Sequence, residues 1–454
     1  MGDAPTVVVG GGLAGVSAAL RLADLGRPAV LIEKRPRLGG AAFSFTRDGL
    51  SIDNGQHVFL RCCEAYRWFL DRIGARDQVV LQDALDIPVL APDGRTARLR
   101  RTPGLPAPLH LTAALAGYGV LGPLDRLRAV RGALALRMLN PADRRLDDRT
   151  LGGYLRRHGQ NDATINALWG IVATATLNLD PDDASLALAA KVFRTGLLDS
   201  APAGDVGYAA VPLGRLHDEL AAKALADAGV EVLVDTAVRQ VAPGAPVEVT
   251  TASGERRIAA ESVVLALPHR EAFQVAPALA DSRAASAQGL GASPIVNVHV
   301  VYDRKVTELP FAAAVNSPVQ WFFDRTDSSG VGQRWSGAQY LAVTVSAAAG
   351  LIDEPSRPVL DRFVPELARL LPGAERAEVL DAFVTRERRA TFRQAAGTWA
   401  RRPGFSDGPN LILLAGAWTD TGWPDTMEGA VRSGVVAAEA SAGIPSHETK
   451  RFGT

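Results

Sequence analysis

The first forty residues carry the clearest pattern of apolar and polar positions in the chain. An apolar run at Val7–Val9 is followed by the spacing Gly10-x-Gly12-x-x-Gly15, and positions 16–25 then repeat with helical spacing. A second apolar run covers Ala29–Glu33. Short apolar runs on either side of a helix are typical of buried parallel strands. The pattern therefore predicts a strand, a tight turn, a helix and a second strand.

Similar patterns return along the chain, on both sides of a long insertion. Helical spacing covers 64–73, 151–155, 163–177, 182–198, 216–228, 358–371 and 427–434. Strand-like runs cover 79–81, 87–90, 96–100, 231–234, 237–241, 247–251, 257–258, 262–268, 378–386 and 410–415. We expect the runs between 79 and 100 to form one small sheet, and those between 247 and 258 to form a hairpin about Ser253–Gly254. Because the first pattern resumes after the insertion, two interleaved domains are expected.

Residues 290–346 alternate between apolar and polar positions. The runs are Ile295–Tyr302, Gln320–Phe323 and Tyr340–Val345. A period of two predicts antiparallel strands with one face in water, and such a sheet would make a floor for a substrate site. His299 lies within this alternation, and we expect it to be a packed strand histidine rather than a catalytic one.

The segment 104–124 is unusual because it contains no Asp, Glu, Lys or Arg and is interrupted by prolines and glycines. Arginines then alternate with apolar residues, at Arg126, Arg128, Arg131 and Arg137. A basic amphipathic helix beside an apolar segment is typical of a surface that enters one leaflet of a membrane. The alternative is a helical subdomain that covers a substrate cavity, since basic amphipathic stretches also occur as solvated faces.

Composition narrows the class of protein. A chain of 454 residues exceeds the ~100 to 200 residues of one domain, so two or three cores are expected. Lys+Arg and Asp+Glu number 49 each, a balance that argues against a nucleic-acid partner. Cys62 and Cys63 are adjacent and supply neither a disulfide framework nor a zinc site, so no metal is expected. The N-terminus has no leader pattern, and we expect a cytoplasmic protein.

The glycine spacing also has a chemical interpretation. Glycines let a pyrophosphate approach the backbone, and the N-terminus of the following helix stabilises its charge. Glu33 ends the second strand, at about the ~20 residues at which an acid accepts hydrogen bonds from a ribose. A purely steric glycine turn is the alternative. The strand, the helix and the acid together favour a dinucleotide.

Two further stretches indicate which dinucleotide is bound. The segment Arg37-Leu-Gly-Gly40 resembles the second FAD contact of the amine oxidase and phytoene desaturase flavoproteins. Near the other end, the strand at 410–415 leads through a loop rich in Thr and Asp into a helix whose free backbone donors suit the pyrimidine edge of an isoalloxazine. A well-capped helix alone would explain Thr426 and Glu428, but not the Ala-Gly and Thr-Gly spacing upstream.

The polar cluster Asp53-Asn-Gly-Gln-His57 lies between two apolar runs, and it has two interpretations. It is either a loop that enters a pocket or a hairpin turn at Asn54–Gly55. With this cluster, the Trp169 helix that ends in Leu177-Asn178, Arg389–Phe392 and the stretch from Trp418 to Gly434, the chain resembles the squalene-associated FAD-dependent desaturase family. The resemblance extends from about residue 6 to 440.

The resemblance implies an α/β fold in which a Rossmann-type FAD-binding domain is interleaved with an α+β substrate domain of mixed antiparallel sheet and helices. The FAD-binding parts are expected at 1–75, 206–275 and 396–445, the substrate parts at 76–205 and 276–395, and a tail at 446–454. The implied cofactor contacts are Gly10, Gly12, Leu13, Ala14, Gly15, Glu33, Lys34, Arg37, Gly39, Gly40, Ala41, Gly55, Gln56, His57, Val238, Ala266, Gly416, Ala417, Thr426, Met427 and Glu428. Family members usually have Asp where this chain has Ala417, which puts FAD affinity in question.

Bacterial members of that family are hydroxysqualene dehydroxylases of hopanoid biosynthesis. The resemblance thus implies reduction of a lipophilic C30 isoprenoid by hydride transfer from FADH2, with Asp53, His57 and Asp420 as candidate acids. Segment 104–124 and the Trp169 helix would form an apolar channel. The protein is expected at the inner face of the cell membrane, with neighbouring squalene-pathway enzymes as contacts.

The sequence is also compatible with two other functions. One is an oxidative carotenoid-type desaturase or amine oxidase on the same scaffold. The other is a non-catalytic prenyl-lipid binding protein without a flavin, against which Glu33 and the C-terminal helix argue.

Overall fold

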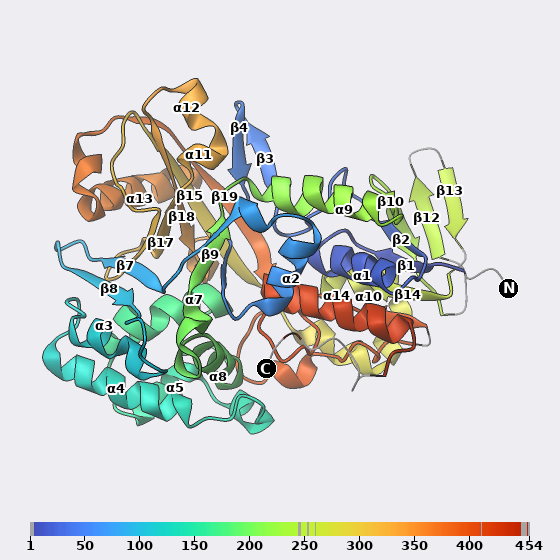
Figure 1. The fold of residues 1–454 in the computed structure, drawn as a ribbon, viewed down its shortest axis with the longest axis horizontal. Helices are drawn as coiled ribbons and strands as arrows, with labels where there is room; N and C mark the ends of the chain where they lie inside the picture. Colours follow the sequence, from blue (N-terminus) through green and yellow to red (C-terminus); the bar gives the residue numbers. More distant parts are fainter. Residues whose placement is uncertain are drawn as a thin grey trace.

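The computed structural model of the protein describes residues 4–243, 247–251, 254–258, 260–409, 411–445 and 452. Ser253 of the expected hairpin turn, the first residue of the expected strand at 410–415 and the tail at 446–454 apart from Phe452 lie outside the described residues. Figure 1 shows the glycine turn and the C-terminal helix in one part of the molecule, a mixed sheet in another, and a group of helices beneath that sheet.

Among the described residues, five parallel strands form the sheet that carries the glycine turn, in the order β10–β2–β1–β14–β20. The strands are β1 (Thr6–Val9), β2 (Ala29–Ile32), β10 (Glu231–Leu233), β14 (Ser262–Leu265) and β20 (Ile412–Leu414). Alternate residues face opposite sides, so that Val8 and Leu31 belong to one core and Val7 and Ile32 to another. Burial on both sides explains why these strands are apolar without interruption.

Helices cover both faces of this parallel sheet. One core contains residues of α1 (Leu13–Asp24), α2 (Glu64–Arg72), α9 (Ala221–Asp227) and α14 (Met427–Ser441), and the core on the opposite face contains residues of α10 (His269–Val275). Beside the sheet, β11 (Ala237–Gln240), β12 (Val247–Thr251) and β13 (Gly254–Ile258) pair antiparallel, as the expected hairpin requires. The expected α/β class is confirmed.

The second sheet is mixed, in the order β19–β15–β18–β17–β16–β7–β8, with β16 and β7 parallel to each other. Its strands are β7 (Asp86–Leu90), β8 (Thr96–Arg100), β15 (Ser293–Tyr302), β16 (Phe311–Ala314), β17 (Trp321–Asp324), β18 (Gln339–Val345) and β19 (Val379–Thr391). The expectation of one wet face is wrong for its centre. The helix α13 (Ser356–Leu370) packs on one side and Leu50 and Ile52 pack with Val331 on the other, so both faces are covered.

His299 occupies the middle of this sheet and is fully buried. Its Nδ1 lies 2.6 Å from the Tyr340 hydroxyl and its Nε2 lies 2.9 Å from the Thr385 hydroxyl. Burial lowers its pKa to about 3, so the ring is neutral at physiological pH. The expected packing role of His299 is confirmed.

The strands expected between 79 and 100 do not form one sheet. The strand β6 (Val79–Leu81) pairs with β9 (Val206–Ala209), which also pairs with β5 (Val58–Leu60), whereas β7 and β8 join the mixed sheet. The prediction of one small sheet is therefore wrong, because non-local pairing rather than local pattern decides which sheet a strand enters. A separate hairpin joins β3 (Ser44–Arg47) to β4 (Leu50–Asp53).

The helical group in Figure 1 is built from the insertion between β8 and β9. It contains α3 (Thr112–Ala116), α4 (Pro123–Arg137), α5 (Leu151–Arg157), α6 (Asp162–Thr164), α7 (Gly170–Leu177) and α8 (Leu186–Phe193). Short helices α11 (Thr326–Ser329) and α12 (Val331–Arg334) lie outside it. Trp169 is buried in its core, where its indole N–H donates to Gln160 and its ring contacts Phe193 edge-on. The long apolar run at 163–177 is thus explained by burial.

Candidate functional site

The glycine turn between β1 and α1 has a geometry that only glycine permits at two positions. A Cβ on Gly15 would stand 1.8 Å from the carbonyl oxygen of Gly10, and Gly10 itself has a φ of +108°. In contrast, a Cβ on Gly12 would meet only the Cα of Gly40, at 3.7 Å. No side chain caps the first turn of α1, whose N-cap is Gly12. The turn therefore packs tightly against the protein at Gly10 and Gly15, whereas the backbone N–H donors at Gly12 and the start of α1 stay free of side-chain caps. A pyrophosphate site needs such free donors.

Glu33 is held beside this turn. Its carboxylate accepts hydrogen bonds from the backbone N–H of Gly11 at 2.7 Å and of Arg35 at 2.9 Å, and the side chain is buried. The neighbouring Lys34 is exposed, and Val238 is half-buried against the core under β2. The contacts of Glu33 with a ribose, and of Lys34 and Val238 with the cofactor, remain predictions.

The second glycine segment touches the first. Gly40 has a φ of +56°, and a Cβ there would stand 2.7 Å from the Cα of Gly12. The guanidinium of Arg37 lies 3.6 Å from the centre of the Phe43 ring and donates to the carbonyl of Leu38. Burial lowers the pKa of Arg37. Two glycine segments that are separated by a helix and a strand thus form one backbone surface.

The C-terminal helix α14 lies alongside α1. A Cβ on Gly434 would stand 2.0 Å from the carbonyl oxygen of Ala14, and Arg21 forms a 2.7 Å ion pair with Glu439. The two helices therefore run in the same direction. Gly434 lies 434 − 427 = 7 residues after the first residue of α14. At a rise of ~1.5 Å per residue, the start of α14 therefore lies about 10 Å beyond the glycine turn along the common helix direction. That offset suits one extended ligand with phosphates at α1 and its far end at α14.

The start of α14 is capped from within. Thr426 is the N-cap, and its hydroxyl accepts a hydrogen bond from the N–H of Gly429. The carboxylate of Glu428 accepts from the N–H groups of Ala65 and Tyr66 at the start of α2, and it pairs with Arg432 at 2.6 Å. The side chain of Glu428 is thus fully engaged. The expected contacts of Glu428 and Met427 with the cofactor remain predictions.

The turn at 416–419 is held by an arginine that sequence reasoning missed. Arg402 is buried and donates to the carbonyls of Ala417, Trp418 and Thr419. Its Nη1 has no hydrogen-bond partner among the described residues, and burial lowers its pKa to about 10. The backbone of this turn is therefore fixed without the aspartate that Ala417 replaces.

The segment that follows β4 is not a hairpin, because β4 and β5 belong to different sheets. Asn54 accepts from the N–H of Phe43 and donates to the carbonyl of Ala41 and to Glu387 of β19. The side chain of Asn297 in β15 donates to the carbonyl of Asn54. The hairpin interpretation is wrong. This segment joins the second glycine segment to the mixed sheet.

Asp53 is buried in an ion pair with Arg325 at 2.8 Å. Its Oδ1 also accepts from the hydroxyl of Ser44 at 2.6 Å and from the N–H of Leu213 at 2.9 Å. Both carboxylate oxygens thus already accept from donors of the protein. The geometry favours a structural role for Asp53.

The other two candidate acids are also constrained. The Nδ1 of His57 lies 3.0 Å from the carbonyl oxygen of Gly55, and burial lowers the pKa of the ring. His57 is therefore neutral at physiological pH. Asp420 accepts from the indole N–H of Trp399 at 2.8 Å and pairs with Arg144. These contacts connect the loop before α14, which contains Asp420, to the helical group.

Asp425, immediately before the N-cap of α14, is a carboxyl group that sequence reasoning missed. Its Oδ2 accepts from the N–H of Phe392 at 2.8 Å, its backbone N–H donates to Gln394, and its Oδ1 has no partner among the described residues. Burial raises its pKa to about 6. The sequence signalled only a turn here, since burial and not residue type sets this pKa.

The resemblance found in the sequence is supported by comparison with known proteins. Residues 13–440 match the model of the family described as flavin containing amine oxidoreductase. The chain belongs to the flavin-containing amine oxidoreductase family. It is an FAD-dependent oxidoreductase.

Relatives with known names match over nearly the whole chain. A hydroxysqualene dehydroxylase of Sinorhizobium fredii is 28% identical over 95% of this chain and 97% of its own. A second hydroxysqualene dehydroxylase, from Rhodopseudomonas palustris, is also 28% identical, over 95% of this chain and 97% of its own. The zeta-carotene desaturase of Arabidopsis thaliana is 23% identical, over 94% of this chain and 83% of its own. The expected family resemblance is confirmed.

Solved structures agree on the fold. A cyclohexylamine oxidase from Brevibacterium oxydans superposes with a TM-score of 0.65 and 18% identity, covering 97% of this chain and 99% of that one. The flavoenzyme fold expected from the sequence is therefore confirmed. Membership of a flavin family also argues against the carrier without a flavin.

Replacement of Gly40 by alanine tests the contact between the glycine segments. The added Cβ would stand 2.7 Å from the Cα of Gly12, and separation of the segments should weaken FAD binding by about tenfold or more, or ~1.4 kcal/mol. The matched control is Gly74→Ala, because Gly74 has a similar φ of +72° with no atom within 4 Å. Retained FAD should be measured by ultrafiltration and absorbance. Equal affinity in the two variants would contradict the assignment.

Proposed function

We propose that this protein converts hydroxysqualene to squalene in squalene or hopanoid biosynthesis. The observation that carries the proposal is the end-to-end match to bacterial relatives named hydroxysqualene dehydroxylase, at 26% to 28% identity. The hydroxyl oxygen of the substrate accepts a proton, and the carbon–oxygen bond breaks with loss of water. A hydride then adds to the resulting carbocation. Reduced FAD supplies that hydride when it is bound.

The protein's own residues have three tasks in this reaction. The glycine segments and the start of α14 hold and orient the cofactor. Apolar side chains must keep other water from the cationic carbon, and the helical core around Trp169 offers such surroundings. An acid must protonate the leaving hydroxyl.

Asp425 fits the acid better than Asp53, His57 or Asp420. It has one carboxyl oxygen without a partner among the described residues, it precedes the helix that faces the flavin, and its pKa of about 6 keeps a useful fraction protonated near neutral pH. Gln394 links it to the helical group, because the Gln394 amide accepts from the backbone N–H of Asp425 and donates to the carbonyl of Leu177. The acid thus adjoins the proposed apolar surroundings.

The reaction itself is tested with anaerobic enzyme and chemically reduced FAD. Hydroxysqualene should be converted to squalene, detected by gas chromatography, in a single turnover. If FAD is bound and fully reduced yet no squalene forms, the proposed reaction is excluded.

Asp425→Asn should lower the single-turnover rate by about a hundredfold, since general acids contribute ~10²- to 10⁴-fold. In the unmodified enzyme the rate should fall as pH rises through about 6, because the protonated carboxyl is the active form; in the variant this dependence should vanish. FAD affinity should be unchanged, and Asp93→Asn at an exposed site is the matched control. A variant that keeps the rate and the pH profile would remove Asp425 from the mechanism.

The substrate resides in bilayers, and α4 offers a surface for one leaflet. The part of the chain that the structure describes holds no helix long and apolar enough to span a membrane. The helix buries Ala129, Gly132 and Leu136 and exposes a stripe spaced three or four residues apart. The exposed fractions are 60% for Leu124, 69% for Leu127, 43% for Val130, 53% for Leu134 and 85% for Met138.

We therefore propose peripheral contact between this stripe and the inner face of the cell membrane. Apolar side chains enter the headgroup region while nearby arginines meet anionic lipids. Exposed arginines of α4 include Arg131 and Arg137. The arrangement supports membrane contact over the alternative that 104–137 only covers a cavity.

The double substitution Leu127→Glu and Leu134→Glu should reduce binding to vesicles containing phosphatidylglycerol by about tenfold or more, as measured by sedimentation. Both side chains are exposed, so folding should be unaffected. Leu411→Glu is the control, since Leu411 is 57% exposed and immediately precedes β20, far in sequence from α4. Undiminished vesicle binding by the double variant would argue that α4 does not touch lipid.

A carotenoid-type desaturase remains the second candidate, because the zeta-carotene desaturase also matches 94% of the chain. The two reactions run in opposite redox directions. A desaturase would reduce oxidised flavin on mixing with phytoene, without any hydroxylated substrate. Stopped-flow absorbance of the oxidised holoenzyme with phytoene separates the two.

A further inference from the structure

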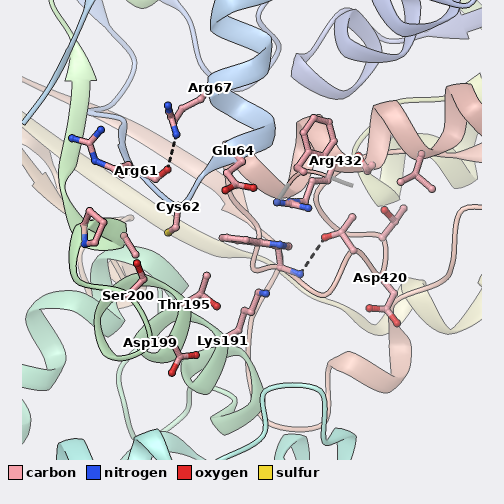
Figure 2. Close-up of a pocket in the computed structure, with 18 of the residues that line it drawn as sticks. Arg61, Cys62, Glu64, Arg67, Lys191, Thr195, Asp199, Ser200, Asp420 and Arg432 are labelled. Carbon is pink, nitrogen blue, oxygen red and sulfur yellow. Dashed lines mark hydrogen bonds between the residues drawn. The ribbon is translucent and has the colours of Figure 1, made fainter. Parts of the chain in front are cut away.

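A cavity lies apart from the glycine turn, between the start of α2, the helix α8 and the loop before α14. Its volume is about 860 Å³, which is within the range of ligand sites. Figure 2 shows Arg67, Lys191 and Arg432 around it, with the hydroxyls of Thr195 and Ser200 at its wall. No residue of the glycine turn lines it.

Two cations of this cavity have no counter-ion. The ammonium group of half-buried Lys191 forms no hydrogen bond or ion pair with any described residue, and it lies 4.6 Å from the centre of the Trp423 ring. Arg67 donates only to the backbone carbonyl of Arg61 and has no carboxylate partner in the described part of the chain. Half-buried cations without a partner are costly unless an anion joins them.

The closeness of Lys191 to a second cation, Arg432, also favours an anion in this cavity. The guanidinium of Arg432 lies 4.9 Å from the same Trp423 ring as Lys191. Burial and this neighbouring arginine lower the pKa of Lys191. An anion bound between the two cations would relieve their repulsion.

Of the three described carboxylates that line the cavity, Asp199 and Asp420 are already engaged. Asp199 pairs with Arg194, and Asp420 pairs with Arg144, neither of which lines the cavity. The backbone donors at the start of α2 are also taken, because Glu428 accepts from them. Glu64 remains, with one buried oxygen that has no partner among the described residues. It suits a hydroxyl or protonated oxygen of a ligand.

We infer that this cavity binds the diphosphate group of an organic diphosphate, with Lys191 and Arg67 on the charged group and the hydroxyls of Thr195 and Ser200 as neutral donors. The rest of the ligand lies against Trp423, Phe405 and Val436 in the cavity wall. Either a nucleotide or a prenyl diphosphate offers this chemistry. The inference is independent of the proposed dehydroxylation.

The test uses enzyme saturated with FAD, so that no probe can occupy the dinucleotide site. Calorimetry with inorganic pyrophosphate at low ionic strength should show saturable binding, and ADP and geranyl diphosphate then distinguish a nucleotide from a prenyl source by which binds more tightly. Lys191→Met and Arg67→Gln, which remove the charge but keep much of the aliphatic part of the side chain, should each weaken pyrophosphate binding by about tenfold or more.

Lys223→Met is the matched control, because Lys223 is exposed on α9 and pairs with Asp227 at 2.5 Å. It should bind pyrophosphate as the unmodified enzyme does. Absence of saturable binding up to about 10 mM, which corresponds to a binding free energy weaker than ~2.7 kcal/mol, would overturn the inference. Equal binding by Lys191→Met and the unmodified enzyme would do the same.

Discussion

The close approach of α14 to α1, backbone against backbone, is the contact on which the rest of the structure depends. Gly434 lets the two helices meet where any side chain would collide with the carbonyl of Ala14, and the ion pair between Arg21 and Glu439 fixes their direction. Residues at opposite ends of the chain thereby share one axis. The separation between the glycine turn and the start of α14 is thereby fixed, at a length that suits one extended dinucleotide.

A second constraint attaches the mixed sheet to this cofactor site. The buried ion pair of Asp53 with Arg325 and the contacts of Asn54 with Glu387 and Asn297 cross between the two parts. Loss of one partner of a buried pair leaves a charge without compensation. The sheet is thus held at a fixed position relative to the second glycine segment.

Much of the cofactor domain could be predicted, because its signals are local. The turn at Gly10–Gly15, the acid Glu33 and the capping Thr426 each follow from residues close in sequence. Non-local features could not be read in this way. Local alternation could not reveal that α13 covers the mixed sheet, or that β6 leaves its neighbours to pair with β9.

The candidate acids illustrate the same limit in chemical terms. Residue type alone made Asp53 and Asp420 as eligible as Asp425, yet partners from distant segments occupy the first two. Sequence shows which groups can carry a proton, whereas packing decides which one keeps it. Asp425 differs because only one donor, the N–H of Phe392, reaches its carboxylate, which forms no ion pair with any described residue.

The loop at 419–426 carries these differences within a few residues. Asp420 binds the helical group, Trp423 lies near Lys191 and Arg432, and Asp425 accepts from Phe392. Each contact reaches a different part of the chain, so the position of the loop is set by all of them together. Because α14 begins where this loop ends, the same contacts also set the position of the first turn of α14.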